Sequence, residues 1–369
     1  MRYTGHMPTP AVTAVTVSAW AGSTNLGDEL ILSALLAKLR RRGVTPCVLS
    51  VDPGATTATH GVRSIGAAAL LRGRAGRPGA VLLGGGGLLQ DETSPFNLPF
   101  HLGRTSLAAV GGRPVAGIGL GVGPVGGRTG KALVRRALRG AVATSVRDRG
   151  SQDLLRTMGV ESLLAADLAL SLAIPQVEVE GRLAVSLRPW TGTRHLVPVG
   201  LRHRTAPATP AWFVPQVARA LDAIARRTGL GIHLVALQAD GDHELHVAVA
   251  DRMTGPATAV APDVGHVVAE IASCEAVVAM RYHAGIAAVL GGRPAVLIGY
   301  SPKVPSLAAE ARGGLEGLTW DEGSLADLPE AVDRVLGRGA AVVEGRERLR
   351  ARERVNDDVI DRLLASDRS

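Results

Sequence analysis

Short apolar runs along the chain are each followed by a polar or glycine-rich turn and then by a segment with helical spacing. The first run, at residues 11–19, leads through a turn at 22–29 to a helix expected from about Leu26 to Arg42. Asn25 suits the N-cap of this helix, and Gly43 follows its end. Strand, turn and helix in this order open a βαβ unit, so the pattern predicts α/β domains built on parallel strands.

The same order recurs along most of the chain. Further strands are expected at 48–51, 81–83, 113–124, 144–147, 183–187, 232–237, 277–280 and 294–298. Proline and alternating charge interrupt the pattern around 173–181, which indicates a linker. We therefore expect one domain at 1–175, a second at 176–345, and a charged helix at 346–369 that packs back across them.

The bulk composition fits two globular domains and narrows the partners. The 369 residues exceed the size of one ordinary core. Aromatic residues make up only 3% of the chain, which argues against a base-stacking nucleic-acid surface, so no nucleic-acid partner is expected. The net charge of +8 favours anionic partners.

Cys47 and Cys274 lie far apart in apolar surroundings, so each is expected to be a small buried residue rather than a disulfide partner or metal ligand. Two cysteines without a disulfide fit a protein in the reducing environment of the cytoplasm. The N-terminal stretch superficially resembles a signal peptide, but Thr13 and Thr16 interrupt its apolar run. No apolar run approaches the length of a membrane span.

Four consecutive glycines, Gly84 to Gly87, follow the apolar run at 81–83. We expect them to form a turn after the strand, where a ligand could lie directly on backbone N–H groups. Gln90 and Asp91 place polar groups at the same carboxyl edge, which is where ligands bind in open α/β sheets. A tight turn without a ligand is the alternative.

Asp28 and Glu29 lie in the first turn of the first expected helix. Carboxylates at this position compensate the helix dipole. They would also repel a phosphate and suit sugar hydroxyls, so the turn is a candidate acceptor site. Both interpretations stay open on the sequence.

Cationic side chains follow several of the expected strands. Arg281 and His283 precede a helix at about 284–290, whose free N–H groups add to the attraction for an anion. Lys303 follows the next strand, and Arg147 ends an earlier one. Together they predict a site for a small anion, although Arg147 could instead pair on the surface with Asp148.

Two suggestive patterns are interpreted as structural. Gly121, Gly123 and Gly126 have the spacing of a dinucleotide fingerprint, but Pro124 interrupts the motif. The acidic and histidine-rich segment 240–246 lacks the spacing of a zinc or calcium motif, so a solvated helix start is expected there and no metal site.

Motifs spread over the chain occur in a characteristic order. They are GSTNLGDELIL, LSVDP, GGGGLLQDETS, GIGLGVGP, SVRDRGS, LLRTMGV, AADLAL, VSLRPW, MRYHAG and YSPKV. In this order and spacing they resemble the polysaccharide pyruvyl transferase family from Val15 to Val304. The likeness is strongest to its CsaB-type members, which act on the secondary cell-wall polymer that anchors S-layer proteins.

The resemblance implies two Rossmann-like domains in a glycosyltransferase-B-like arrangement, with phosphoenolpyruvate (PEP) as co-substrate and no cofactor. A pyruvyl group would move from PEP onto two hydroxyls of one sugar as a ketal, with release of phosphate. The resemblance implies that Arg147, His283 and Lys303 hold PEP. We add Arg281 to the expected PEP-binding residues because it lies close to His283 in the sequence. His283 or a neighbouring carboxylate is the candidate acid, and Asp28, Glu29 or Asp91 is the candidate base or orienting group. The candidate acceptor-binding residues are Asn25, Gly85, Gly86, Gln90 and Arg188.

The expected acceptor is a lipid-linked cell-wall saccharide, such as an N-acetylmannosamine-containing precursor, at the inner face of the plasma membrane. Peripheral membrane contact would then involve Arg40 to Arg42 or the basic stripe from Lys131 to Arg139, although solvated helix faces explain both. A homo-oligomer is compatible with the sequence. The alternatives are a nucleotide-sugar glycosyltransferase and a non-catalytic protein that binds PEP or a glycan.

Overall fold

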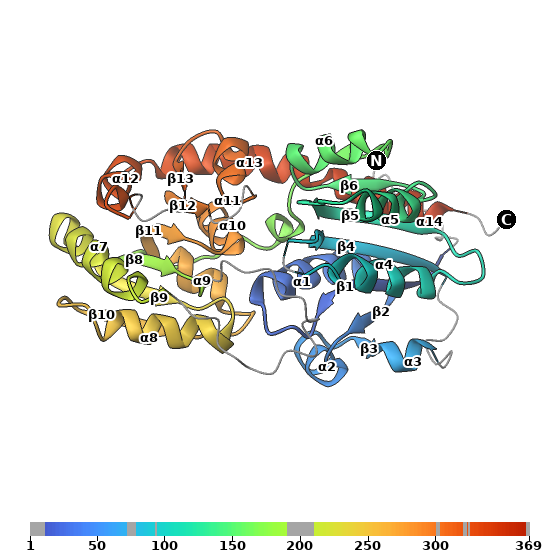
Figure 1. Cartoon of the computed structure of the whole chain (residues 1–369), viewed down its shortest axis with the longest axis horizontal. Coiled ribbons are helices and arrows are strands. Elements are labelled where there is room, and N and C mark those ends of the chain that lie inside the picture. The colour runs from blue at the N-terminus through green and yellow to red at the C-terminus, as the bar shows by residue number, and fades with distance from the viewer. Residues whose placement is uncertain are drawn as a thin grey trace, which may run out of the picture. The chain divides into compact units, whose positions relative to one another are not determined.

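The computed structural model describes residues 12–71, 79–92, 94–189, 210–299, 303–319, 323 and 325–366 (Figure 1). These residues form two compact units, each with its own parallel sheet. Unit 1 comprises the described residues of Met1–Ser23, Ile31–Leu168 and Arg354–Ser369. Unit 2 comprises those of Thr24–Leu30 and Ala169–Glu353.

Unit 1 is built on a seven-stranded sheet in the order β3-β2-β1-β4-β5-β6-β7. Its strands are β1 (Ala14–Ala21), β2 (Thr45–Ser50), β3 (Arg63–Ile65), β4 (Ala80–Leu89), β5 (Val115–Val122), β6 (Thr144–Val146) and β7 (Leu163–Leu164). Its helical segments are α1 (Leu26–Arg41, which starts in unit 2), α2 (Pro53–His60), α3 (Ala67–Leu71), α4 (Asn97–Ala108), α5 (Arg128–Leu138), α6 (Arg149–Thr157) and α14 (Val355–Ala365). The 3-10 turn η1 (Leu168–Ser171) follows β7.

Unit 2 is built on a six-stranded sheet in the order β10-β9-β8-β11-β12-β13. Its strands are β8 (Glu180–Ser186), β9 (Gly231–Val235), β10 (Ala257–Val260), β11 (Cys274–Ala279), β12 (Ala295–Gly299) and β13 (Leu315–Thr319). Its helical segments are α7 (Phe213–Thr228), η3 (Ala239–His243), α8 (Glu244–Ala250), α9 (Val267–Ala272), α10 (Tyr282–Gly291), α11 (Lys303–Ala311), α12 (Leu328–Val335) and α13 (Gly339–Glu353).

Both sheets share one strand order. Counted from the first strand of its unit, each runs 3-2-1-4-5-6, and β7 is added at the edge in unit 1. This is the Rossmann order, in which ligands bind beyond the carboxyl ends of the strands where the order reverses. The reversal lies between β1 and β4 in unit 1 and between β8 and β11 in unit 2. The predicted α/β class with two Rossmann-like domains is confirmed.

The glycine run belongs to a strand and not to a turn. β4 continues through all four glycines, and Gly84 is paired with Ile118 of β5. A side-chain carbon on Gly85 would lie 2.4 Å from Ile31 Cγ2 and 2.8 Å from Leu168 Cδ1. Glycine is therefore needed so that α1 and η1 can pack directly on the strand. The expectation of a glycine turn with exposed N–H groups is wrong.

The end of the chain returns to unit 1. The segment expected as one helix at 346–369 is divided at Arg354 into α13, in unit 2, and α14, in unit 1. Asn356 of α14 is fully buried, where it accepts a hydrogen bond from Ser145 Oγ at 2.7 Å and donates one to the carbonyl of Ala166 at 3.0 Å. The predicted domain boundary at 175 lies in the segment that joins η1 to β8.

Apolar side chains fill the space between each sheet and its helices. In unit 1 they come from β4, β5 and the helices α4, α5 and α6, and in unit 2 from β8, β9, β11, α7 and α12. Cys47 and Cys274 are buried, and burial raises the pKa of both thiols, to about 11 for Cys274. Within the described ranges, no helix has the length and apolar character needed to cross a bilayer.

Candidate active site

The carboxyl end of β11 carries the most chemically capable residues of unit 2. The strand is a nearly fully buried apolar run, and after Met280 it delivers Arg281 in an extended conformation as the N-cap residue of α10. His283 follows in the first turn of the helix and is buried. Because arginine has no acceptor atom, it cannot cap the N–H groups of this turn, which leaves a helix N-terminus that favours an anion.

The guanidinium of Arg281 is held in place by a buried acid. Asp242 accepts from Arg281 Nε at 2.8 Å and from a terminal nitrogen at 2.5 Å, and its own carboxyl group has no exposed surface. Gln238 Oε1 accepts from the same guanidinium at 3.1 Å. A two-point contact of this kind fixes the plane of the guanidinium as well as its position.

Asp242 corrects an expectation for the segment 240–246. This segment was expected to be a solvated helix start, but Asp242 and His246 have no exposed surface. Gly241, at φ 94°, reverses the chain within η3, and the backbone N–H of Gln238 donates to Asp242 at 3.1 Å. The acidic residue that resembled a metal ligand is instead the partner of Arg281.

His246 ties this network to the end of β8. Its Nε2 accepts from the backbone N–H of Leu187 at 3.0 Å. Burial, the main cause, and the nearby charges of Arg281 and His243 lower the pKa of His246 to about 3, although the contact of its Nε2 with the carbonyl of Leu187, at 3.3 Å, opposes this. The imidazole is therefore neutral at physiological pH. Arg188, a predicted acceptor residue, follows Leu187 and is half-buried.

The start of α1 is part of the same site, because residues 24–30 belong to unit 2. The backbone N–H of Leu26 donates to the carbonyl of Leu237 at 2.8 Å, and Asn25 forms an antiparallel bridge with Gln238. A side-chain carbon on Gly27 would lie 2.2 Å from Nδ1 of His283. Only glycine at this position lets the helix start lie against the imidazole.

Asn25 is the N-cap that the sequence predicted. Its Oδ1 accepts from the backbone N–H of Gly27 at 3.1 Å, and its Nδ2 donates to Asp28 Oδ2 at 2.7 Å. Asp28 is half-buried and Glu29 is buried in the first turn of α1. The structure thus brings predicted acceptor-side residues of α1 next to the predicted anion-side residues of α10, within one unit.

The predicted site residues that follow β4 make structural contacts in unit 1. Both carboxylate oxygens of Asp91 accept from the backbone N–H of Gly126, at 3.1 and 2.9 Å. Gln90 is buried, and Asn97 Nδ2 donates to its carbonyl at 3.0 Å. Gly86 is buried in β4, as Gly85 is.

Arg147 is a buried arginine of unit 1. It donates to Asp167 Oδ2 at 3.1 Å, and its Nε lies 3.6 Å from Asp148 Oδ2. A side-chain carbon on Gly121 would lie 2.9 Å from Arg147 Nε, which explains one glycine of the GIGLGVGP motif. The expected surface pair with Asp148 is a buried cluster in which Asp167 makes the shorter contact. Lys303 begins α11, but its side chain lies outside the described part of the chain.

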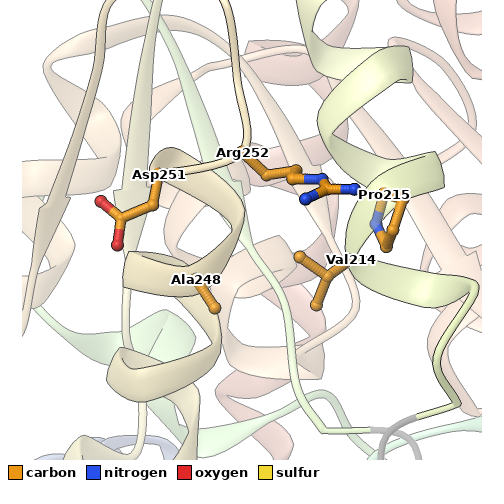
Figure 2. A pocket seen from close by; sticks show the side chains of 5 residues that line it. All are labelled: Val214, Pro215, Ala248, Asp251 and Arg252. Atoms are coloured by element: carbon orange, nitrogen blue, oxygen red, sulfur yellow. The ribbon is translucent and has the colours of Figure 1, made fainter.

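A surface hollow of about 480 Å³ lies elsewhere in unit 2, between α7 and α8. It is lined by Val214, Pro215, Ala248, Asp251 and Arg252. Figure 2 shows Arg252 directed toward Pro215, while the carboxylate of Asp251 points away from the α7 side chains. None of the predicted site residues lines this hollow.

The chain is similar in fold to several solved bacterial structures. MnaA of S. aureus with UDP gives a TM-score of 0.61 at 9% identity, with 94% of each chain covered. HepE of Anabaena in complex with UDP gives 0.57 at 12% identity, with 94% of this chain and 98% of that chain covered. The UDP-GlcNAc 2-epimerase of Neisseria meningitidis bound to UDP-GlcNAc gives 0.58 at 10% identity, with coverage of 96% and 100%. At these identities the likeness concerns the fold alone.

Family membership rests on the sequence match. No curated protein matches the chain. The family described as polysaccharide pyruvyl transferase matches residues 25–302, a range that includes the start of α1, the glycine strand, Arg147 and the β11–α10 segment. This range covers most of the chain and confirms the resemblance seen in the motifs. The chain belongs to the polysaccharide pyruvyl transferase family.

Proposed function

We propose that the protein transfers a pyruvyl group from PEP to two hydroxyls of one sugar in a cell-wall saccharide, forming a cyclic ketal and releasing phosphate. The observation that carries this proposal is the convergence of Arg281, fixed by Asp242, and His283 at the N-terminus of α10. PEP carries a phosphate and a carboxylate close together, so its site needs oriented cations and N–H groups.

The reaction requires a proton donor near the methylene carbon of PEP. Protonation converts that methylene into a methyl group and leaves positive charge on the adjacent carbon, which a sugar oxygen attacks. The second hydroxyl of the sugar attacks the same carbon as the C–O bond to phosphate breaks. The two sugar hydroxyls lose two protons in all. One of these is matched by the proton that the new methyl group gains, and the other by the proton that the released phosphate takes up. We assign the donor role to His283.

The acceptor sugar needs a group that orients or deprotonates its hydroxyls. We assign this role to Asp28, with Glu29 as the neighbouring carboxylate, because Gly27 beside them lies against the His283 ring. Asp91 is a weaker candidate, since both its oxygens already accept from Gly126. Asn25, Gln90 and Arg188 remain our proposed acceptor contacts, and Arg147 and Lys303 our further proposed contacts to PEP.

A lipid-linked saccharide acceptor would bring the protein to the inner face of the plasma membrane. Of the two basic patches expected to contact it, we favour the one on α5. Lys131, Arg135 and Arg136 of this helix are exposed, as is Arg139 directly after it. In the other patch, Arg40 donates a hydrogen bond to the carbonyl of His60, and Arg42 donates one to Asp361. Replacing Arg135 and Arg136 with glutamate should therefore weaken binding to anionic vesicles, measured by co-sedimentation. Unchanged binding would refute the membrane contact.

The proposal is tested by incubating the protein with PEP and candidate lipid-linked disaccharides. Phosphate release and the mass of the saccharide are followed together, and we expect one phosphate for each saccharide that gains a pyruvyl group. A parallel arm replaces PEP with UDP-sugars, to test for glycosyl transfer. Transfer of a sugar in that arm, with no consumption of PEP, would contradict pyruvyl transfer and support a glycosyltransferase. PEP binding without any phosphate release would support a non-catalytic protein.

A further inference from the structure

A buried arginine in unit 1 has no acidic partner among the residues that the structure describes. The side chain of Arg104, on α4, is only 7% exposed. Neither of its terminal nitrogens makes a hydrogen bond to any residue that the structure describes. Its guanidinium lies over the ring of Phe100, whose centroid is 4.9 Å from the guanidinium carbon. Burial lowers the pKa of Arg104 to about 10, so the group keeps its charge at neutral pH.

His101, one turn earlier on α4, lies in the same cluster and is 2% exposed. Its ring packs edge-on against Trp20 and Phe100, at centroid distances of 5.6 and 5.1 Å. Burial and the charge of Arg104 lower its pKa to about 3, so the imidazole is neutral. Its Nδ1 has no hydrogen-bond partner in the described part of the chain.

Polar groups line the face of β1 that packs on α4. Thr16 and Ser18 are fully buried there, and Thr105 Oγ1 donates to Ser18 Oγ at 3.0 Å. On the solvent side of the cluster, Phe100 is 39% exposed. A single exposed ring, that of Phe100, therefore lies over the buried guanidinium.

This arrangement is unfavourable unless an anion completes it. Taking an ionised group out of water without a partner is costly, and folded proteins pair almost all of their buried charges. A cation–π contact with one ring leaves the five N–H donors of a guanidinium unsatisfied. With His101 neutral and no carboxylate bonded to Arg104 among the described residues, the cluster has a net positive charge.

We propose that Arg104 and His101 form a second anion site, in unit 1, which binds a phosphate group. The fork of the guanidinium suits two phosphate oxygens, and a neutral imidazole nitrogen can donate a third hydrogen bond. The exposed ring of Phe100 would then contact whatever apolar chain the phosphate carries. The site is independent of the α10 site and does not rest on pyruvyl transfer.

The test is thermal unfolding of the full chain in inorganic phosphate and in chloride at equal ionic strength. A ligand that binds only the folded state raises the Tm, so phosphate should raise the Tm of the wild-type protein by about 2 °C or more. Arg104→Met should reduce this rise, and any rise that remains belongs to the α10 site, which is expected to bind phosphate as well. In chloride the Tm of Arg104→Met should equal or exceed that of the wild type, because an unpaired buried charge has been removed. Arg136→Met, the same change at an exposed position, should keep the phosphate response.

Two further variants separate this site from the α10 site and protect the test against misfolding. His283→Ala should keep the part of the rise that depends on Arg104, whereas loss of the whole rise in this variant would assign the phosphate to the α10 site. Arg104→Lys keeps the charge without the planar fork and should show a reduced rise. A wild-type Tm that does not respond to phosphate, or an Arg104→Met protein that responds as strongly as the wild type, would overturn the proposal.

The source of the phosphate is distinguished by a second probe. Farnesyl phosphate, with farnesol as the uncharged control, presents the same group on an apolar chain. A lipid phosphate is indicated if farnesyl phosphate raises the Tm at a lower concentration than inorganic phosphate does. Farnesol should then cause no such rise, and neither should farnesyl phosphate with Arg104→Met. If farnesyl phosphate and inorganic phosphate raise the Tm at the same concentration, the site binds free phosphate.

Discussion

At the scale of single residues, the candidate active site depends on a glycine whose role is steric. Gly27 is the second residue of α1, and any side chain there would collide with the imidazole of His283. The backbone at this point is ordinary helix, so glycine is kept for the room it leaves and not for its conformational freedom. The alternative explanation of such a glycine, a flexible helix start, predicts no effect on the reaction.

Gly27→Ala should therefore impair the reaction more than it impairs folding. The methyl group must push away either the His283 ring or the start of α1, and overpacking of this kind costs about 1–3 kcal/mol. We expect kcat/KM for PEP to fall by about tenfold or more, measured by phosphate release. Gly54→Ala is the matched control, because Gly54 is the second residue of α2 and an added methyl there meets only Asp52 Oδ1, at 3.4 Å. Equal rates in the two variants would contradict the steric role.

Residues adjacent in sequence were predictable, and residues that meet through the fold were not. The strand-to-helix pattern placed Arg281 and His283 at a strand end, and the polar turn marked Asn25 as a helix cap, as the hydrogen bond to Gly27 shows. Asp242 was missed, since it lies 39 residues from Arg281 in the chain and its local sequence fits a solvated helix start equally well. The only signal was the unusual acidic and histidine content of its segment.

At the scale of elements, the inner strands of both sheets were predicted in the right places. Their ends were not, and the edge strands β3, β7, β10 and β13 were not predicted at all. The glycines of β4 favour a turn by local propensity, yet strand pairing with β5 and packing by α1 and η1 override that propensity. These contacts are tertiary, so local sequence carries no direct sign of them. The same limit explains the division of the C-terminal helix, because α14 is held by its contacts with unit 1.

The attachment of α14 should weaken in acid. Lys38, almost fully buried on α1, donates to Asp357 Oδ2 at 2.9 Å, and Arg42 donates to Oδ1 at 2.9 Å. Burial raises the pKa of Asp357, but these two cations outweigh burial and leave the pKa below its usual value. Because the folded-state pKa is the lower one, the stabilisation is complete above the unfolded pKa of about 4. It is lost as the pH falls further, through the folded-state pKa.

Asp357→Asn tests this pH dependence by denaturant unfolding between neutral and acidic pH. At neutral pH the variant should lose about 3–5 kcal/mol, because the buried ammonium of Lys38 keeps no charged partner at this position. It should also lose less stability than the wild type when the pH is lowered below about 4. A variant whose stability follows the same pH profile as the wild type would show that Asp357 does not carry the effect.

At the scale of the whole molecule, one strand order is used twice. Each unit has the 3-2-1-4-5-6 sheet, so each has a reversal point whose carboxyl edge is suited to a ligand. The sequence predicted two α/β domains from their repeated strand–turn–helix pattern. It did not predict that the start of α1 belongs with unit 2. That assignment depends on the contacts of Leu26 with Leu237, two residues after β9, and of Gly27 with His283 of α10.

The central claim is that the α10 site consumes PEP, and PEP-dependent phosphate release by His283→Ala tests it most directly. His266→Ala is the matched control, since His266 is an exposed histidine of the same unit whose ring lies 2.7 Å from Asp263 Oδ1. With a saccharide acceptor present, we expect His283→Ala to lower kcat by about 100-fold or more, as for loss of a general acid, while His266→Ala keeps the wild-type rate. Phosphate release by His283→Ala at the wild-type rate would contradict the account.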